Sequence, residues 1–278
     1  MNISDWLRHA RSTLAEAGCP DPEIDARWIA EDTLGMTRTD LIFESDRAVP
    51  SDKLPLLESL LQRRASGEPV QYILGSADFM GLRFQVDRSV LIPRQDTETL
   101  VEAALIAVRG MDAPEVLDLC AGSGCIGLSI KSLAPDARVT LADISREALE
   151  VARRNMRALG VEAALHHGDL FRAVGRRRFD IIVSNPPYIP QDELPGLQRE
   201  VRFEPRLALD GGPAGMDLVG RIIREAPDHL AAGGLLLMEI DDTQEALVLD
   251  ACGQSGRYAS YEVLKDLAGK VRYLKAIC

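Results

Sequence analysis

Residues 115–128, EVLDLCAGSGCIGL, join a short apolar run to a glycine-rich turn and a second apolar segment. The first run has the length of a buried strand, and the residues after the turn suit the start of a helix. Gly122 and Gly124 allow the backbone to turn tightly and to approach a ligand closely. With Gly127 they fit G-x-G-x-x-G, which alone supports a nucleotide site only weakly. A turn without a ligand and a nicotinamide enzyme therefore both stay open.

Further apolar runs recur along the chain and predict strands that alternate with helices. The predicted strands are residues 115–120, 137–144, 163–167, 179–183 and 233–240, with helices at 127–134 and 146–159 between the first three. Such alternation indicates a parallel sheet covered by helices on both faces. Two later runs, residues 258–264 and 271–277, predict a final antiparallel pair. We expect an α/β fold with a Rossmann-like, mostly parallel sheet whose last strand is antiparallel.

The first 66 residues show a helical pattern instead. Apolar residues three and four positions apart predict a first helix, namely Trp6, Leu7, Ala10 and Leu14. A second helix should begin near Pro22 and end at Gly35, and it carries the apolar residues Ile24, Trp28, Ile29 and Leu34. Ser51 is the predicted cap of a last helix. We predict a helical domain over residues 1–75, a linking hairpin over 76–92 and an α/β domain over 93–278.

Composition and charge exclude several classes of protein. The chain has 278 residues and a net charge of -11, which disfavours wrapping of nucleic acid because that requires a Lys/Arg surface. The start lacks a signal peptide's apolar core, and no apolar run is long enough to span a membrane. The cysteines are odd in number and form no CxxC pair: Cys19, Cys120, Cys125, Cys252 and Cys278. We expect a cytoplasmic protein with reduced thiols and no metal site.

Two aspartates follow the second and third predicted strands. Asp143 lies nineteen positions beyond Gly124, where a carboxylate can accept hydrogen bonds from a ribose diol. Its alternative role is to cap the next helix, for which Ser145 is an equally good candidate. Asp169 is placed to accept a hydrogen bond from an adenine amine, although a simple turn aspartate is nearly as good an interpretation.

The fourth predicted strand continues into SNPPY, residues 184–188. Pro186 holds Asn185 extended, and two fixed φ angles, at Pro186 and Pro187, make a stiff loop. The Asn185 Oδ1 atom and the Pro186 carbonyl can each accept one N–H of a planar amine or amide. They would hold its nitrogen in line with a methyl group and stabilise the growing positive charge, while Tyr188 stacks on the planar group. The alternative is an Asn-Pro turn beside a core tyrosine.

The chain resembles the class I S-adenosylmethionine-dependent methyltransferases, specifically the protein-(glutamine-N5) methyltransferases that modify peptide chain release factors. Six motifs carry the resemblance, in the family's order: GEPVQYILG (67–75), LIPRQDTE (91–98), DLCAGSG (118–124), SNPPYI (184–189), VRFEPRLAL (201–209) and KDLAGKVRYL (265–274). They extend nearly from end to end. NPPY alone is shared with adenine-N6 DNA methyltransferases, whereas LIPRxDTE and RFEP are more selective.

The resemblance implies a role for each candidate residue. The loop formed by Cys120, Ala121, Gly122, Ser123 and Gly124 would hold the methionine part of S-adenosylmethionine, which leaves as S-adenosylhomocysteine. Asp143 would bind the ribose, and Asp169 and Leu170 the adenine. Catalysis would rest on Asn185, Pro186 and Tyr188, which with Pro187 bind the glutamine of a Gly-Gly-Gln loop; Asn185 also borders the cofactor. Arg94 and Thr97 would help close the pocket, and the helical domain would dock a class 1 release factor.

Four residues depart from the family pattern. Cys120 and Ala121 stand where the family often has other small residues, with little consequence. Leu170 replaces an aromatic residue that some members have, and Asp241 stands where members often have glycine.

Other functions stay open on the sequence alone. A ribosomal-protein glutamine methyltransferase would share the NPPY chemistry and differ in docking. A DNA adenine methyltransferase needs a basic recognition surface, and the only basic run, residues 176–178, is more typical of a solvated loop. A nicotinamide oxidoreductase would need an acid or base partner that the sequence does not show, and a non-catalytic scaffold would not need NPPY.

Overall fold

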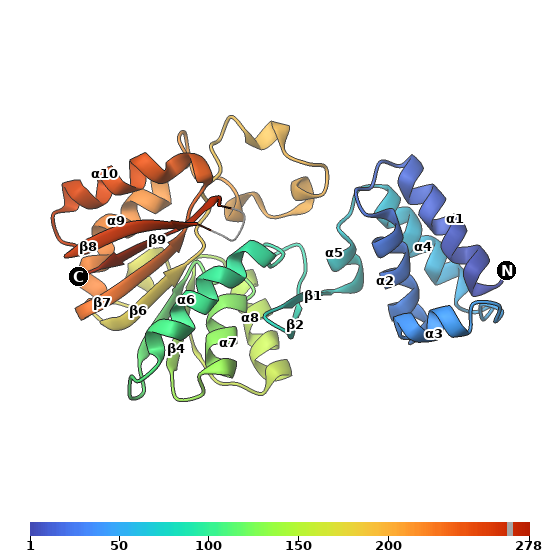
Figure 1. The fold of residues 1–278 in the computed structure, drawn as a ribbon, viewed down its shortest axis with the longest axis horizontal. Helices are drawn as coiled ribbons and strands as arrows, with labels where there is room; N and C mark the ends of the chain where they lie inside the picture. Colours follow the sequence, from blue (N-terminus) through green and yellow to red (C-terminus); the bar gives the residue numbers. More distant parts are fainter. Residues whose placement is uncertain (266–268) are drawn as a thin grey trace. The chain divides into compact units, whose positions relative to one another are not determined.

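A computed structural model describes residues 1–265 and 269–278 (Figure 1). Residues 266–268 of the KDLAGKVRYL motif lie outside the described residues. The chain forms two compact units, one of Met1–Ser76 with Gln198–Phe203 and one of Ala77–Leu197 with Glu204–Cys278. The backbone therefore passes between the units three times, after Ser76, Leu197 and Phe203.

The first unit is a small helical bundle. Its helices are α1 (Ile3–Glu16), α2 (Pro22–Leu34), α3 (Arg38–Phe43), α4 (Leu54–Ala65) and α5 (Val70–Leu74). Trp6, Leu14, Ile29 and Leu57 are fully buried and form part of its core. Each such side chain contributes about 1.5–3 kcal/mol by leaving water.

The ends of these helices test the capping predictions. α2 begins at Pro22 and ends before Gly35, whose φ of 64° gives the expected left-handed cap. The prediction for Ser51 is wrong, because the helix begins at Leu54 after Lys53, with a proline in its first turn. Residues 50–53 form a turn instead, in which the Lys53 N–H bonds the Pro50 carbonyl at 3.0 Å.

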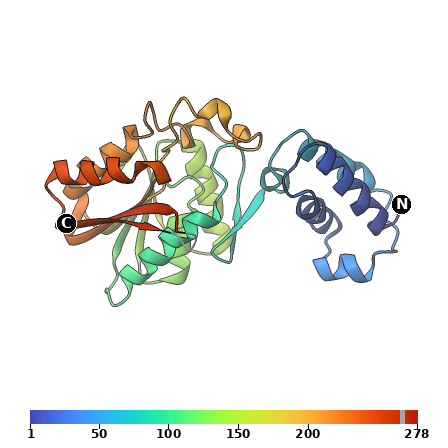
Figure 2. The same cartoon turned by 45° about the horizontal axis from the view of Figure 1, so that its top comes forward.

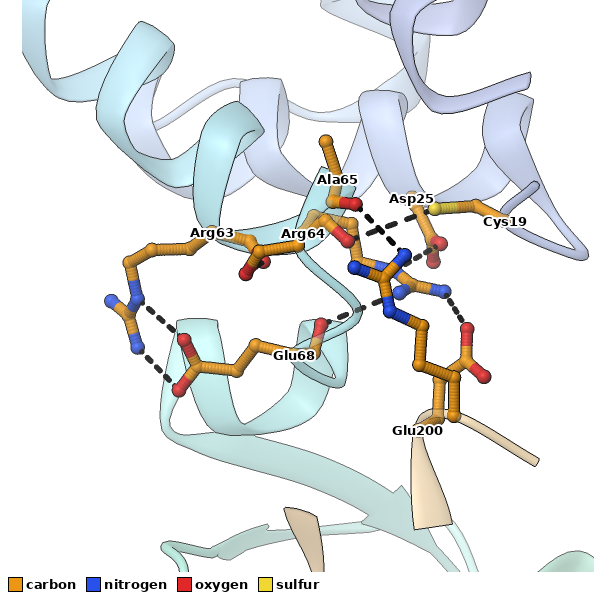
Figure 3. A network of polar contacts seen from close by, with 9 residues as sticks. Cys19, Asp25, Arg63, Arg64, Ala65, Glu68 and Glu200 are labelled. Carbon is orange, nitrogen blue, oxygen red and sulfur yellow. Dashed lines mark hydrogen bonds and ion pairs between the residues drawn. The ribbon is translucent and has the colours of Figure 1, made fainter. Parts of the chain in front are cut away.

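A buried polar network ties the segment Gln198–Phe203 to the helices (Figure 3). Arg64 Nε donates to Asp25 Oδ2 at 2.6 Å, and its Nη2 donates to Glu200 Oε1 at 2.9 Å. Arg199 Nη1 donates to the Ala65 carbonyl at 3.2 Å. These bonds make six residues that follow the NPPY motif part of the N-terminal unit.

The second unit is built on a seven-stranded sheet with the order β5-β4-β3-β6-β7-β9-β8. The strands are β3 (Glu115–Leu119), β4 (Arg138–Asp143), β5 (Ala164–His167), β6 (Phe179–Ser184), β7 (Leu230–Glu239), β8 (Ser260–Lys265) and β9 (Val271–Ile277). β3 to β7 pair in parallel, and β9 is antiparallel to both its neighbours. The predicted fold class and the antiparallel last strand are confirmed.

Helices cover both faces of this sheet (Figures 1 and 2). They are α6 (Glu98–Val108), α7 (Cys125–Leu133) and α8 (Arg146–Leu159) on one face, and α9 (Asp217–His229) and α10 (Glu245–Ser255) on the other. Successive side chains of β7 alternate between the two cores: Leu235 and Leu237 pack with α6 and α7, whereas Leu236 and Met238 pack with α9 and α10. This explains the continuous apolar run, since both faces of a covered parallel strand are buried.

A hairpin of β1 (Ser76–Phe79) and β2 (Leu82–Gln85) precedes the sheet in the chain. Met80 and Gly81 have φ angles of 52° and 71°, which suit a two-residue turn between strands. Phe79 and Phe84 meet edge to face with ring centroids 6.1 Å apart and enter the core beside α6.

The strand order decides where a ligand fits. β4 and β5 lie on one side of β3, and β6 and β7 lie on the other. Chain connections therefore leave β3 and β6 in opposite directions, which opens a crevice at the carboxyl ends of these strands. The glycine loop follows β3 and the NPPY motif follows β6. No helix among the described residues has the length and apolar character needed to cross a membrane.

Candidate methyl-transfer site

A cavity of about 580 Å³ lies at the carboxyl ends of β3, β4 and β6. All the residues predicted to hold a cofactor, except Gly124, line it: Cys120, Ala121, Gly122, Ser123, Asp143, Asp169, Leu170 and Asn185. Arg94, Thr97 and Pro187 also line it, whereas Pro186 and Tyr188 do not. The fold thus brings together residues from five separate stretches of sequence.

The three glycines of the loop serve different purposes. A Cβ on Gly122 would meet no atom within 4 Å, so this residue faces open space on the cavity wall. Gly124 has a φ of 79° and is the N-cap of α7. A Cβ on Gly127 would lie 2.3 Å from Leu141 Cδ2, so glycine allows α7 to pack against β4. Only Gly122 of the three borders the cavity.

Two cavity residues other than glycine have left-handed backbones. Cys120 has a φ of 62° and Leu170 a φ of 47°. Such conformations are costly for residues with a Cβ and persist where surrounding structure enforces them, often at ligand sites.

Asp143 ends β4 and organises the loop. Its Oδ2 accepts the Gly122 N–H and its Oδ1 accepts the Ser145 N–H, both at 2.8 Å. Burial raises the pKa of Asp143, and these backbone bonds partly oppose that rise. The α8 cap is Ser145, whose Oγ accepts the Ala148 N–H at 3.1 Å. Asp143 is thus free of the capping role, and it lines the cavity.

Asp169 has a partner that the sequence did not reveal. Arg221 of α9 donates to both of its oxygens, at 3.0 and 2.9 Å, and also lines the cavity. The bond from Arg221 holds the pKa of Asp169 below its usual range. Arg221 belongs to no recognisable motif, and only the packing of α9 beside residue 169 identifies it.

Asn185 and Tyr188 belong to one hydrogen-bonded chain. Asn185 Nδ2 lies 3.2 Å from Thr97 Oγ1, and Thr97 Oγ1 donates to Glu239 Oε2 at 2.6 Å. Tyr188 donates its hydroxyl proton to Glu239 Oε1 at 3.0 Å. We name Thr97, Asn185, Tyr188 and Glu239 the Glu239 cluster. No group in the described part of the chain donates to Asn185 Oδ1.

Glu239 was missed at the level of sequence. It is 6% exposed and ends β7, and burial raises its pKa against the hydrogen bonds from Thr97 and Tyr188. Burial and the Glu239 carboxylate raise the pKa of Tyr188, so its hydroxyl stays protonated. A signal was present in the sequence, because an acidic residue closing the apolar run GGLLLM is unusual for a buried strand.

The RFEP motif supplies another buried carboxylate near the cavity. Glu204 is 6% exposed and forms an ion pair with Arg94, and its Oε2 accepts the Ile92 N–H at 3.1 Å. The pair joins the LIPR and RFEP motifs on one wall. The two residues of the pair are 110 positions apart in the sequence.

Two features left open by the sequence acquire structural roles. Asp241 caps the turn before α10, where its Oδ1 accepts the Thr243 N–H and the Gln244 side chain accepts the Asp241 N–H. Within the basic run, Arg177 lies over the Phe179 ring and pairs with Glu115. Glu115 and Phe179 begin their strands, so this run lies at the sheet edge opposite the cavity.

Comparison with known proteins gives two family matches. Residues 5–75 match the PrmC N-terminal domain, and residues 96–196 match the Methyltransferase small domain. The chain is 42% identical over 255 residues to a release factor glutamine methyltransferase of Geobacter sulfurreducens, covering 91% of this chain and 88% of that protein. It is 39% identical over 274 residues to the protein of the same name from Moorella thermoacetica, covering 98% and 97%.

A solved structure supports the fold. The T. thermophilus 16S rRNA N2 G1207 methyltransferase, in complex with AdoMet and guanosine, matches with a TM-score of 0.52 and 20% identity. The match covers 73% of this chain and 49% of that one.

Proposed function

Because this chain belongs to the release factor glutamine methyltransferase family, we propose that it methylates peptide chain release factors. The methyl group of S-adenosylmethionine is transferred to the side-chain amide nitrogen of the glutamine in their Gly-Gly-Gln motif. The observation that carries the proposal is an asparagine at the tip of β6 with its Oδ1 unused, on the wall of a cavity lined by the glycine loop.

The residues of the cavity fit S-adenosylmethionine. The open space beside Gly122 accommodates an extended chain, and the Asp143 carboxylate on the cavity wall accepts the ribose hydroxyls. Asp169, held as a carboxylate by Arg221, accepts the adenine amine while Leu170 packs against the ring. When bound, the cofactor supplies an electrophilic methyl group on its sulfonium sulfur.

Asn185 and Pro186 address the weak nucleophilicity of a carboxamide. The Asn185 Oδ1 atom and the Pro186 carbonyl, here called the amide clamp, each accept one N–H of the substrate glutamine. This holds the nitrogen in line with the methyl carbon and stabilises the positive charge that grows as the N–C bond forms. The C–S electron pair leaves with sulfur, and one amide proton then leaves to solvent. Tyr188 favours the cationic amide through its ring face.

The helical unit is proposed to contact the release factor away from its glutamine. Phe43 is 85% exposed and its neighbour Ile42 is 64% exposed, both at the end of α3. Large apolar side chains exposed side by side are typical of interaction surfaces. Phe43→Ser should raise KM for an intact release factor and leave KM for a short Gly-Gly-Gln peptide unchanged. Ile106→Ser, which removes a 65% exposed apolar residue of the other unit, is the matched control.

Radiolabelled methyl transfer tests the function directly. The purified chain is incubated with labelled S-adenosylmethionine and a release factor, its Gly-Gly-Ala variant, ribosomal protein or DNA. Label should enter only the release factor with its glutamine intact. Label in ribosomal protein or DNA, with none in the release factor, would refute the proposal.

A further inference from the structure

A buried carboxylate beside the amide clamp has no part in binding the reactants as proposed above. We infer that Glu239 sets the direction of the hydrogen bonds at Asn185 and anchors Tyr188, which makes Glu239 and Thr97 positioning residues for methyl transfer. The inference rests on the proposed function and extends it to the residues that hold Asn185 and Tyr188 in place.

Strand pairing explains why Glu239 lies beside Asn185. β6 and β7 run in parallel with Ser184 opposite Met238. Asn185, which follows β6, and Glu239, the last residue of β7, are the residues that come next in the sequence. Thr97 comes from the turn that begins α6, 142 residues away from Glu239 in the chain. It is 2% exposed and lines the cavity.

The chemistry of these groups gives the chain of bonds one direction. A carboxylate only accepts hydrogen bonds, and a threonine hydroxyl has a single proton to donate. The Thr97 proton points to Glu239 Oε2, so Thr97 Oγ1 acts as an acceptor toward Asn185. The NH₂ group of Asn185 must then face Thr97, and its Oδ1 faces the substrate side.

The opposite orientation of the asparagine amide would disable the clamp. The NH₂ group of Asn185 would then meet the N–H groups of the substrate glutamine, and two donors do not bond. The growing positive charge on the substrate nitrogen would also face an amide donor instead of an oxygen. Without Thr97 and Glu239, little in the site distinguishes the two orientations.

Tyr188 is held at two points, its ring hydroxyl by Glu239 and its main-chain carbonyl by Gln244. Glu239 Oε1 accepts the Tyr188 hydroxyl, while Gln244 Nε2 donates to the Tyr188 carbonyl at 3.1 Å. The charge of Arg272 acts to lower the pKa of Glu239, but Arg272 forms its own ion pair with Asp96 at 2.9 Å. Among the described residues, the direct hydrogen-bond donors to Glu239 are the two hydroxyls.

The decisive experiment compares Thr97→Val with Thr97→Ser. Valine keeps the shape of threonine but cannot accept from Asn185 or donate to Glu239, whereas serine does both. Thr97→Val should lower kcat about tenfold, the effect of losing one well-placed hydrogen bond, and Thr97→Ser should recover most of it. The Tm of both variants should stay near the wild-type value. Equal kcat in wild type and Thr97→Val, or equal losses in both variants, would overturn the inference.

Glu239→Gln and Tyr188→Phe distinguish the two hydrogen bonds to Glu239, one from Thr97 and one from Tyr188. A glutamine has one acceptor oxygen, so it serves Thr97 or Tyr188 but not both, and kcat should fall. Tyr188→Phe removes only the bond from the ring hydroxyl and should cost less than Thr97→Val. A larger loss of kcat in Tyr188→Phe than in Thr97→Val would contradict the conclusion that the bond through Thr97 matters more than the bond to Tyr188.

A spectroscopic measurement keeps this test separate from the proposed function. In the ¹⁵N-labelled protein, the side-chain amide signals of Asn185, assigned through Asn185→Ala, should shift in Thr97→Val and not in Thr97→Ser. That result would support the positioning role even if the wild-type chain failed to methylate release factors. Unshifted signals with an active wild-type enzyme would refute the positioning role alone.

Discussion

Two buried carboxylate clusters, one in each unit, are satisfied in different ways. In the Arg64 cluster (Asp25, Arg64 and Glu200), a guanidinium bonds both carboxylates and the side chains of Arg64 and Asp25 are at most 7% exposed. In the Glu239 cluster the buried carboxylate meets hydroxyl donors, and the chain of bonds ends at an amide whose oxygen is unused. In the first cluster a cation pairs with both carboxylates, so the cluster stabilises the fold and leaves neither carboxylate unpaired. The second leaves one acceptor available, as a reaction site requires.

Asp118 of β3 extends the comparison to a third case. It is fully buried, its Oδ2 accepts the Gly127 N–H at 2.8 Å, and its Oδ1 has no partner among the described residues. Burial raises its pKa to about 7, the Gly127 bond opposes the rise, and Asp143 adds to it. A buried carboxylate with neither cation nor hydroxyl thus tends to take up a proton.

The largest effect should come from Arg64→Met. It leaves Asp25 buried without its guanidinium, which typically costs about 3–5 kcal/mol of stability. Both tryptophans, Trp6 and Trp28, belong to the helical unit, so fluorescence during urea unfolding follows that unit. Arg47→Met, which breaks the exposed Arg47–Glu44 pair, should cost less than about 1 kcal/mol. Similar losses in the two variants would remove the distinction between buried and exposed pairs.

Asn185→Ala should have the next largest effect, and on turnover instead of stability. Removing one group that stabilises developing charge typically lowers kcat about 10²-fold or more. The side chain is only partly buried, so Tm should change little. Methyl transfer to a release factor gives kcat, and a variant with normal turnover would rule out the amide clamp.

Asp143→Asn should weaken cofactor binding by about 1.5–3 kcal/mol, the usual range for a lost bond to a charged acceptor. The single oxygen of the asparagine amide still accepts one N–H of the loop. Its NH₂ group, however, is a donor and faces the other N–H, that of Gly122 or Ser145. Calorimetry with S-adenosylhomocysteine measures the change, and kcat at saturating S-adenosylmethionine serves as the control. Unchanged affinity would remove the ribose role of Asp143.

The smallest effect concerns Asp118 and depends on pH. Its folded-state pKa of about 7 lies above the ordinary value of 3.8, so the folded state binds the proton more tightly. Stability should therefore fall as pH rises from about 4 through 7. Asp118→Asn does not titrate, so from pH 5 to pH 8 it should gain at least about 1.4 kcal/mol relative to wild type, the equivalent of one pKa unit. A constant difference in unfolding free energy across that range would contradict the raised pKa.

Much of the site was predictable because its residues follow strands. Asp143 and Asn185 each come at or just after the end of an apolar run, and parallel strands bring their carboxyl ends to one edge. The partners of these residues were not predictable. Thr97 and Glu239 are 142 residues apart, Arg64 and Glu200 are 136 apart, and Asp169 and Arg221 are 52 apart. No local pattern relates such pairs, because each depends on how two elements pack.

The order of strands and helices, the glycine turn and the stiff NPPY loop follow from the sequence by itself, because periodicity and backbone restrictions act over a few residues. Only the tertiary structure decided that residues 198–203 belong with the N-terminal helices, that Arg221 holds Asp169, and that Glu239 is the buried acceptor behind Asn185. Burial and donor–acceptor matching between distant side chains made those choices, and both arise only when the chain has folded.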